Sequence, residues 1–150
     1  IPSHVKIMFV GNEFDQTIKQ GIEQCAQQLN ITDNVIFAGP QSAMPTVYTA
    51  ADLIVLPSLW EGLPNVVIEA MACQCPVVVS DVSDNALLIN DQNYGFIFAA
   101  GDDQALAQKL EQCINMPKPQ FQQMGMHARA YIQSLCGLDV FISRYEQLIK

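Results

Sequence analysis

The chain has 150 residues, of which half are apolar and 15% are charged. This length supports one domain with a substantial hydrophobic core, and the composition excludes both a disordered chain and a small disulfide-stabilised scaffold. Fifteen acidic residues against seven basic ones give a net charge of −8, so we expect neither nucleic acid nor anionic lipid to bind through simple charge attraction.

Short apolar runs typical of strands alternate with apolar residues at helical spacing. The predicted elements, in chain order, are strand Val5–Val10, helix Phe14–Leu29, strand Val35–Phe37, helix Met44–Ala51, strand Leu53–Leu56, helix Pro64–Cys73, strand Val77–Val79, helix Asn85–Ile89, strand Gly95–Phe98, and helices Gln104–Cys113, Phe121–Leu135 and Leu138–Ile149. Continuously apolar strands separated by helices indicate parallel βαβ units whose sheet is covered on both faces. We therefore predict an α/β fold with a doubly wound, Rossmann-like parallel sheet.

Five cysteines form no CxxC pair and lie mostly within apolar or helical patterns. This favours reduced, buried thiols in a cytoplasmic protein. The most apolar region, residues 66–79, is interrupted by Glu69, Gln74 and Pro76, which argues against a membrane span. The chain opens directly on a strand pattern without a leader or an initiator Met, which indicates a piece of a longer protein.

In doubly wound sheets, ligands bind at the carboxyl ends of the strands. The loop after Val10 has one glycine, Gly11, and lacks both the three glycines of a dinucleotide fingerprint and the lysine of a Walker loop. The loop after Leu56 leads instead to Pro64, which suits the first position of a helix. Free amides and the positive end of the helix dipole make such a helix start suitable for phosphate.

Two carboxylates lie on either side of this helix start. Glu69 is surrounded by apolar residues on the predicted helix, and burying it unpaired would cost several kcal/mol or raise its pKa. Glu61 precedes the helix, whereas Glu69 lies about 7 to 8 Å along it from Pro64. The two carboxylates could accept hydrogen bonds from the hydroxyl groups of a polyol and of a ribose. The spacing alone leaves open that Glu69 bonds backbone amides and that Glu61 is a solvated loop acid.

The run from Tyr48 to Cys73, with Pro76-Val77-Val78, resembles the donor-binding half of glycosyltransferase family 4. These are retaining enzymes of the GT-B fold, and the E-x7-E element, here Glu61 with Glu69, is the family's signature. Flanking matches extend the resemblance over nearly the whole chain. It implies that residues 1–150 form the C-terminal donor-binding domain of a GT-B glycosyltransferase, with the N-terminal acceptor domain absent from this chain.

The resemblance also implies roles for individual residues. Glu61 would contact hydroxyls of the transferred sugar near its reacting carbon, and Glu69 would bind the ribose hydroxyls. Backbone amides would hold the distal phosphate at Gly62, Leu63, Asn65 and Val66. The backbone after the second strand would hold the nucleobase at Gly39, Pro40 and Gln41.

The implied donor is a nucleoside-diphosphate sugar, without a cofactor or an obligatory metal. The EGLPNV motif at residues 61–66 resembles the corresponding motif of family members that use UDP-hexoses or UDP-N-acetylhexosamines. Acceptors in the family are often glycans or lipid-linked saccharides of the cell envelope, which points to polysaccharide biosynthesis and to binding through the missing N-terminal domain. We expect a cytoplasmic protein whose full-length form could associate peripherally with the inner face of the membrane.

The sequence departs from the family pattern in two respects, at Gln74 and at Ser83, Asp84 and Leu87. Gln74 replaces a Gly at the helix end, where a left-handed conformation would cost it about 1 kcal/mol. Gly-Gly and a following Glu are replaced by Ser83, Asp84 and Leu87, which puts the shape of the sugar pocket in question. All seven basic residues lie outside the candidate loops, so the Arg and Lys that neutralise the departing diphosphate in this family are expected upstream of Ile1.

Two other functions stay open. One is a nucleotide-sugar epimerase of the same two-domain fold, and the other is a non-catalytic α/β ligand-binding module. A phosphoacceptor module would need an Asp at the carboxyl end of the third strand, but Asp52 precedes that strand. His4 and His127 lie outside the candidate loops, so we expect them at a strand edge and on a helix surface.

Overall fold

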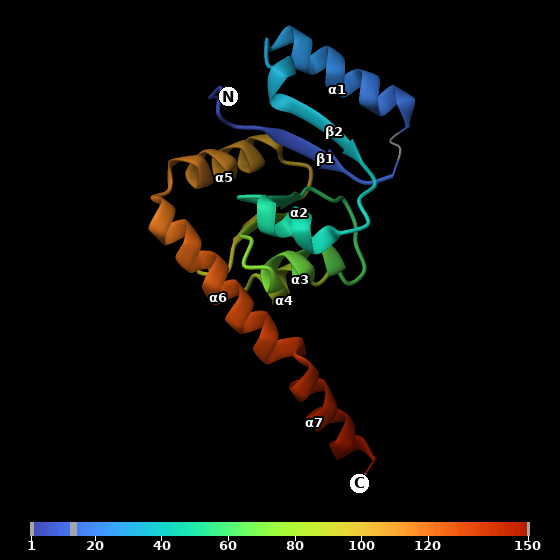
Figure 1. Cartoon of the computed structure of the whole chain (residues 1–150), viewed down its shortest axis with the longest axis vertical. Coiled ribbons are helices and arrows are strands. Elements are labelled where there is room, and N and C mark those ends of the chain that lie inside the picture. Colours follow the sequence, from blue (N-terminus) through green and yellow to red (C-terminus); the bar gives the residue numbers. More distant parts are fainter. Residues whose placement is uncertain (1, 13–14, 150) are drawn as a thin grey trace. The chain divides into compact units, whose positions relative to one another are not determined.

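A computed structural model of the chain describes residues 2–12 and 15–149 (Figure 1). It divides into two compact units, Ile1–Met44 and Pro45–Lys150, each with its own parallel sheet. The predicted α/β class with parallel strands is therefore confirmed, and the hydrogen-bonded strands of the described residues form two separate ladders. The predicted start of the first helix at Phe14 lies outside the described residues.

The first unit is a single βαβ crossover. Strands β1 (Ile7–Val10) and β2 (Val35–Gly39) pair in parallel through helix α1 (Gln16–Gln28) and a short 3-10 helix η1 (Thr32–Asn34) that the sequence did not predict. Asp15 caps α1 by accepting a 2.8 Å hydrogen bond from the Thr17 amide, which lowers the pKa of that carboxyl. The ammonium of Lys19 lies 5.1 Å from the ring centroid of Phe37, so α1 packs against β2.

The expectation that every strand is covered on both faces is wrong for this unit. Ile7 and Met8 of β1 are 37% and 53% exposed, and Ile36 of β2 is also exposed. Within this unit, one α-helix packs against the two-stranded sheet and covers one of its faces. Continuous apolar character therefore overstated the burial of these two strands.

The second unit has a three-stranded parallel sheet in the order β3-β4-β5. Its strands are β3 (Ile54–Leu56), β4 (Val77–Ser80) and β5 (Phe96–Phe98). The middle strand is fully buried, with Val77, Val78 and Val79 all at 0% exposure. The helices are α2 (Met44–Ala50), α3 (Asn65–Ala72), α4 (Asn85–Leu88), α5 (Asp103–Asn115), α6 (Lys118–Cys136) and α7 (Leu138–Leu148).

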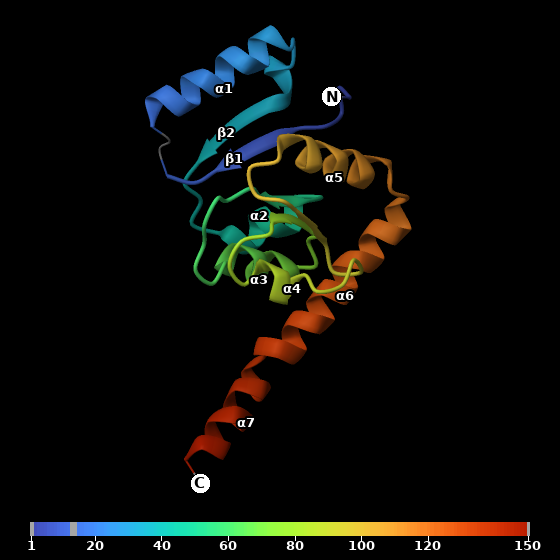
Figure 2. The same cartoon turned by 180° about the vertical axis from the view of Figure 1, so that it is seen from behind.

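The core of this unit lies between the sheet and helices α5 and α6. Val78, Phe96 and Phe98 pack there with Cys113 of α5 and Met124 of α6. Helix α6 also runs beside α3, as both views show, and α7 continues beyond α6 away from the sheet (Figures 1 and 2). The apolar residues of α7 are consequently exposed along its length.

The contact between α3 and α6 is unusually close at one point. A Cβ added at Gly125 of α6 would lie 2.1 Å from the carbonyl oxygen of Gln74, directly after α3. Gln74 has a φ of 62°, which confirms the predicted left-handed conformation at this helix end. Glycine in α6 thus lets the helix pass over the turn that connects α3 to β4.

The cysteines differ in burial. All five are free, but Cys25 and Cys136 are exposed, so the prediction of buried thiols is wrong for these two. Burial raises the pKa of Cys75 to about 12 and that of Cys113 to about 11. Among the helices of residues 2–12 and 15–149, none combines the length and apolar character needed to cross a bilayer.

The close approach at Gly125 predicts opposite effects for two Gly→Ala substitutions. Gly125→Ala forces its Cβ into the Gln74 backbone, so the free energy of unfolding should fall by about 1–3 kcal/mol. Gly21→Ala is the matched control, because nothing lies within 4 Å of a Cβ there and alanine favours the helix by about 0.5–1 kcal/mol. Urea unfolding followed by circular dichroism measures both; a Gly125→Ala protein as stable as the wild type would contradict this packing.

Candidate functional site

The loops of the candidate site begin at one edge of the second unit's sheet. Leu56 of β3 pairs with Val79 of β4, so these parallel strands end within a residue of each other. Residues 57–64 follow β3 and lead to α3, and residues 81–84 follow β4 and lead to α4. The carboxyl ends of adjacent parallel strands therefore place both loops side by side, as the doubly wound fold requires of a ligand site.

Glu61 lies in the first of these loops and is partly buried. The Ser58 hydroxyl donates to its Oε1 over 2.6 Å. The Ser83 hydroxyl, from the turn before α4, donates to the carbonyl oxygen of Glu61. Glu61 is thus bonded through both its side chain and its backbone, while its Oε2 accepts no hydrogen bond from the described residues.

Glu69 is exposed, so the expectation of a carboxylate inside a buried helix is wrong. Helix α3 buries Val67, Ala70 and Met71 and leaves a stripe open to solvent at Asn65, Val66, Glu69 and Ala72. The apolar residues Val66 and Ala72 share this open stripe, and so the apolar composition of α3 does not imply burial all round. Glu69 projects from the stripe just over one turn into the helix.

The partner of Glu69 is Tyr48 of α2. The Tyr48 hydroxyl donates to Glu69 Oε2 over 2.8 Å, and the tyrosine itself is only 2% exposed. Burial, the bond to Glu69 and the charge of that carboxylate all hold the pKa of Tyr48 well above its ordinary value. Glu69 makes no ion pair with a described basic residue such as Arg129. The open side of α3 therefore carries a carboxylate with one oxygen still available.

The start of α3 has the free donors that the sequence predicted, with one difference in detail. Pro64 is the N-cap residue rather than the first helical residue, and no side chain caps the helix. The Asn65 amide donates to the Leu63 carbonyl over 3.0 Å. Within the described part of the chain, the amides of Gly62, Leu63 and Val66 form no hydrogen bond. These exposed amides, together with the helix dipole, make a point that favours an anion.

The three residues predicted to face a nucleobase belong to the first unit. Gly39 has a φ of 65°, and its carbonyl accepts a 3.1 Å hydrogen bond from the Gly11 amide. Gln41 turns its side-chain amide back to the Ala38 carbonyl over 2.8 Å, and Pro40 is exposed. Gly39 ends β2, and Pro40 and Gln41 follow it directly, at the carboxyl end of the strand.

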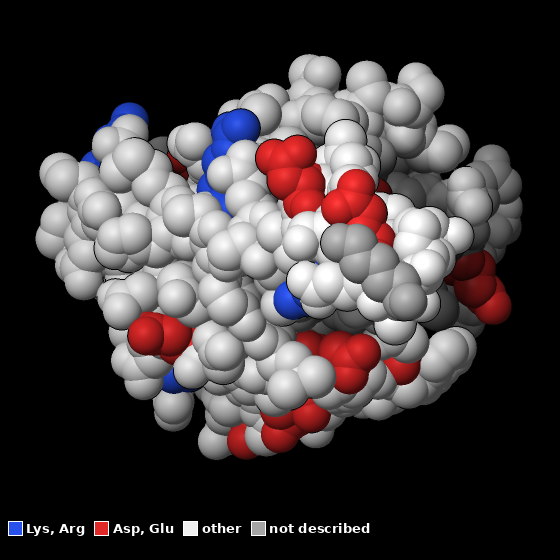
Figure 3. All heavy atoms as spheres, turned by 90° about the horizontal axis from the view of Figure 1, so that it is seen from below, with Lys and Arg blue, Asp and Glu red and all other residues white. Residues whose placement is uncertain are grey.

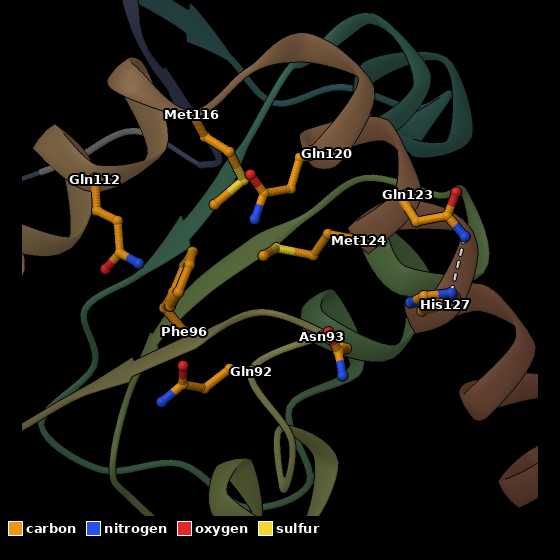
Figure 4. Close-up of a pocket in the computed structure, with 9 residues that line it drawn as sticks. All are labelled: Gln92, Asn93, Phe96, Gln112, Met116, Gln120, Gln123, Met124 and His127. Carbon is orange, nitrogen blue, oxygen red and sulfur yellow. Dashed lines mark hydrogen bonds between the residues drawn. The ribbon is translucent and has the colours of Figure 1, made fainter.

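One hollow of the second unit lies away from these loops. It measures about 190 Å³ and is lined by Gln92, Asn93, Phe96, Gln112, Met116, Gln120, Gln123, Met124 and His127 (Figure 4). The Gln123 amide and the exposed His127 ring are hydrogen-bonded over 2.9 Å. No predicted site residue lines this hollow. Within the described ranges, no three His, Cys, Asp or Glu side chains group as metal ligands.

Acidic residues dominate the charge near the site. Glu61, Glu69, Asp81 and Asp84 all lie in the two loops or on α3, whereas every basic residue lies outside them. On the face drawn in Figure 3, acidic side chains form several patches and basic ones are few. Apart from the amides at the α3 start, the described site therefore offers an anion little positive charge.

Three side chains that bond Glu61 or Glu69 were not predicted: Tyr48 and Ser58, which bond the carboxylates, and Ser83, which bonds the Glu61 carbonyl. Ser58 could have been found, because it precedes Glu61 by three residues and a loop can close that distance. Tyr48 and Ser83 could not, since each lies more than twenty residues from its partner and on a different element. Their contacts depend on how α2 and the α4 turn pack against the β3–α3 connection.

Comparison with known proteins agrees with this geometry. The profile of the family Glycosyl transferases group 1 matches residues 3–131. The chain belongs to this family. It is 28% identical over 102 residues to the UDP-Gal:alpha-D-GlcNAc-diphosphoundecaprenol alpha-1,3-galactosyltransferase of Escherichia coli, covering 68% of this chain and 26% of that enzyme. It is 30% identical over 118 residues to the putative glycosyltransferase EpsD of Bacillus subtilis, covering 79% of this chain and 30% of that protein.

Solved structures show the same fold. The Anabaena protein HepE in complex with UDP superposes with a TM-score of 0.87 at 24% identity, covering 98% of this chain and 41% of that one. Sucrose-phosphate synthase from Thermosynechococcus elongatus gives a TM-score of 0.82 at 27% identity, covering 96% and 37%. The structural neighbours are GT-B glycosyltransferases, and the chain matches a part of each. It spans less than a third of the two curated relatives named above.

The Tyr48–Glu69 bond predicts a pH-dependent effect of Tyr48→Phe. At pH 8 the loss of one hydrogen bond should lower the free energy of unfolding by about 1 kcal/mol. Above pH 10, the ordinary pKa of tyrosine, the unfolded wild type loses the Tyr48 proton while the folded state keeps it, so wild-type stability falls as the pH rises. The phenylalanine variant lacks this contribution. Urea unfolding at pH 8 and pH 10.5 should show that the difference in free energy of unfolding between the wild type and Tyr48→Phe is smaller at the higher pH. An equal difference at both pH values would contradict the raised pKa of Tyr48.

Proposed function

We propose that this chain is the C-terminal donor-binding domain of a retaining glycosyltransferase of family 4. The observation that carries the proposal is the arrangement around the start of α3, where free backbone amides lie between Glu61 and Glu69. A nucleoside-diphosphate sugar carries hydroxyls on both sides of its diphosphate. The arrangement offers carboxylate acceptors on both sides of an anion-binding point.

Each carboxylate has one oxygen engaged and one free. Ser58 occupies Oε1 of Glu61 and Tyr48 occupies Oε2 of Glu69. In the proposed complex, the free oxygen of Glu61 accepts from hydroxyls of the transferred sugar near the reacting carbon, and that of Glu69 accepts from the ribose. The amides of Gly62, Leu63 and Val66 bind the distal phosphate. The Asn65 amide joins them only after it releases the Leu63 carbonyl.

The donor we propose is a UDP-hexose or a UDP-N-acetylhexosamine. The E. coli relative is named for UDP-Gal, and the Anabaena protein has been solved with UDP and with UDP-glucose. The backbone of Gly39, Pro40 and Gln41 would face the nucleobase, and transfer would need neither a cofactor nor an obligatory metal. We further propose a glycan or lipid-linked acceptor bound by an N-terminal domain, in a cytoplasmic protein of polysaccharide biosynthesis that associates peripherally with the inner face of the membrane.

The charge of the site bears on catalysis. A departing diphosphate must be neutralised, and such electrostatic stabilisation is usually the largest catalytic contribution. Glu61 and Glu69 are negative, and none of the seven basic residues lies in the site loops. We therefore propose that an Arg and a Lys preceding Ile1 in the full-length protein supply the missing charge.

The roles proposed for the two carboxylates predict different binding defects in the full-length protein. Glu69→Gln should weaken binding of UDP and UDP-glucose alike, by about 10-fold or more, because a charged acceptor for the ribose is lost. Glu61→Gln should weaken UDP-glucose and leave UDP unchanged. Glu111→Gln, an exposed acid on α5, is the control and should change neither. Isothermal titration measures all three; UDP binding unaffected by Glu69→Gln would reject the ribose role.

The 150-residue chain alone should be catalytically inert and should bind UDP only weakly, because the proposed cations and the acceptor domain are absent from it. The full-length protein should transfer sugar from a UDP-sugar to a glycan or lipid-linked acceptor. Product analysis by mass spectrometry checks both. Transfer by the isolated chain would contradict the need for the upstream segment, and an epimerised nucleotide sugar from the full-length protein would replace the transferase with an epimerase.

A further inference from the structure

We propose that Ser83 is a positioning residue for the donor sugar: its hydroxyl fixes the backbone of Glu61 and so sets where the Glu61 carboxylate meets that sugar. The inference rests on the proposed function, because it assumes that Glu61 contacts the sugar. It assigns a role to a residue outside the E-x7-E element, on the turn between β4 and α4.

The loop that carries Glu61 is not held by apolar packing at its tip. Leu59 is 72% exposed and Trp60 is 83% exposed, and Leu63 on the other side of Glu61 is exposed as well. Side chains of this size would anchor a loop if they were buried. Because they are not, the position of Glu61 depends on polar contacts with the neighbouring strand and turn.

Three serine hydroxyls supply those contacts, and we call Ser58, Ser80 and Ser83 the serine clamp. Ser80, fully buried at the end of β4, donates to the Ser58 carbonyl over 2.6 Å. Ser58 donates to the Glu61 carboxylate, and Ser83 donates to the Glu61 carbonyl. The buried Asn85 side chain donates to the Ser80 carbonyl over 2.9 Å and ties the same strand end to α4. The clamp thus connects Glu61 to the most buried strand of the sheet.

Ser83 differs from the other two serines of the clamp in its backbone conformation. Its φ of 48° lies in the left-handed region, which is unfavourable for a residue with a Cβ and free of strain for glycine. Strained residues persist where surrounding contacts hold them, and they concentrate at functional sites. Serine at this position forms the hydrogen bond to Glu61, and glycine could not form it.

The geometry separates two parts of donor binding. The ribose contact proposed above lies on α3, and the Ser83 hydroxyl does not bond Glu69. The Glu61 carbonyl that Ser83 bonds shares a planar peptide group with the Gly62 amide, which is one of the three amides proposed for the phosphate. The Glu61 oxygen left free by Ser58 is the group that the clamp orients. Loss of the Ser83 hydroxyl should therefore chiefly reduce the additional affinity that the sugar brings to UDP. The affinity for UDP itself should change little, because the amides of Leu63 and Val66 and the Glu69 carboxylate are not bonded by Ser83.

The test uses the full-length protein with Ser83→Gly and Ser83→Asn. Ser83→Gly removes the hydroxyl and the strain together. Ser83→Asn keeps a donor and a residue that tolerates the left-handed region. Asn30→Gly is the matched control, because Asn30 has a φ of 54° at the end of α1, far along the chain from the clamp. The ligands are UDP, UDP-glucose and UDP-N-acetylglucosamine, and amide hydrogen exchange of residues 59–63 is followed without ligand.

For Ser83→Gly we expect the affinity for UDP to stay within twofold of wild type. The affinity for the UDP-sugar that the wild type binds more tightly should fall 5- to 10-fold, which is about the effect of losing one hydrogen bond. Exchange at residues 59–63 should accelerate. Ser83→Asn should restore much of the UDP-sugar affinity and of the slow exchange at residues 59–63. Asn30→Gly should change neither the affinity nor the exchange. A purely structural role would lower UDP and UDP-sugar affinities equally, which would overturn the inference, as would unchanged exchange in Ser83→Gly.

These results also separate the inference from the proposed function. If the wild type binds a UDP-sugar more tightly than UDP and Ser83→Gly binds as the wild type does, the proposed function stands and the role of Ser83 is rejected. If the wild type shows no extra affinity from the sugar, then the sugar contact of Glu61 and the positioning role both fail. Accelerated exchange in Ser83→Gly would then show a clamp that holds the loop without serving a donor.

Discussion

The complete burial of β4 is the constraint on which the candidate site depends. Val77, Val78 and Val79 are closed off from solvent while they pair in parallel with β3 and β5. Backbone groups buried on both sides of β4 need hydrogen-bond partners, and the pairing places Leu56 of β3 opposite Val79 of β4. That register ends β3 and β4 together, which brings the Glu61 loop and the turn before α4 to one edge.

Beyond that edge, hydrogen bonds and not apolar packing hold the Glu61 loop in place. The loop tip leaves its large apolar side chains in solvent, and hydroxyls bond both Glu61 and Glu69. A hydrogen bond fixes direction as well as distance, whereas apolar burial alone would hold a carboxylate only loosely. The arrangement suits a site that must present one free oxygen of each carboxylate to a hydroxyl.

Much of the fold could be predicted from the sequence, because strand runs and helical spacing are local patterns; the structure places every predicted element within a few residues of its expected bounds. The left-handed conformation of Gln74 was predicted on another ground, because the family that the sequence resembles has a Gly at this helix end. The prediction that Glu69 is buried was wrong, because the apolar composition of α3 does not determine which of its faces the neighbouring elements cover. The contacts of Tyr48 and Ser83 could not be predicted, because they join residues distant in sequence through tertiary packing.

Gln74 and Ser83 illustrate two reasons for keeping a side chain in a left-handed conformation. Gln74 lies at the end of α3, where its carbonyl meets Gly125 of α6 and the Gln74 side chain bonds nothing in the described structure. Its strain of about 1 kcal/mol is offset by the packing of two helices, and glycine would serve equally well there. At Ser83 the side chain itself makes the contact, through a hydroxyl on Glu61. The strain is similar, but only at Ser83 does the side chain act on a group proposed to meet a ligand.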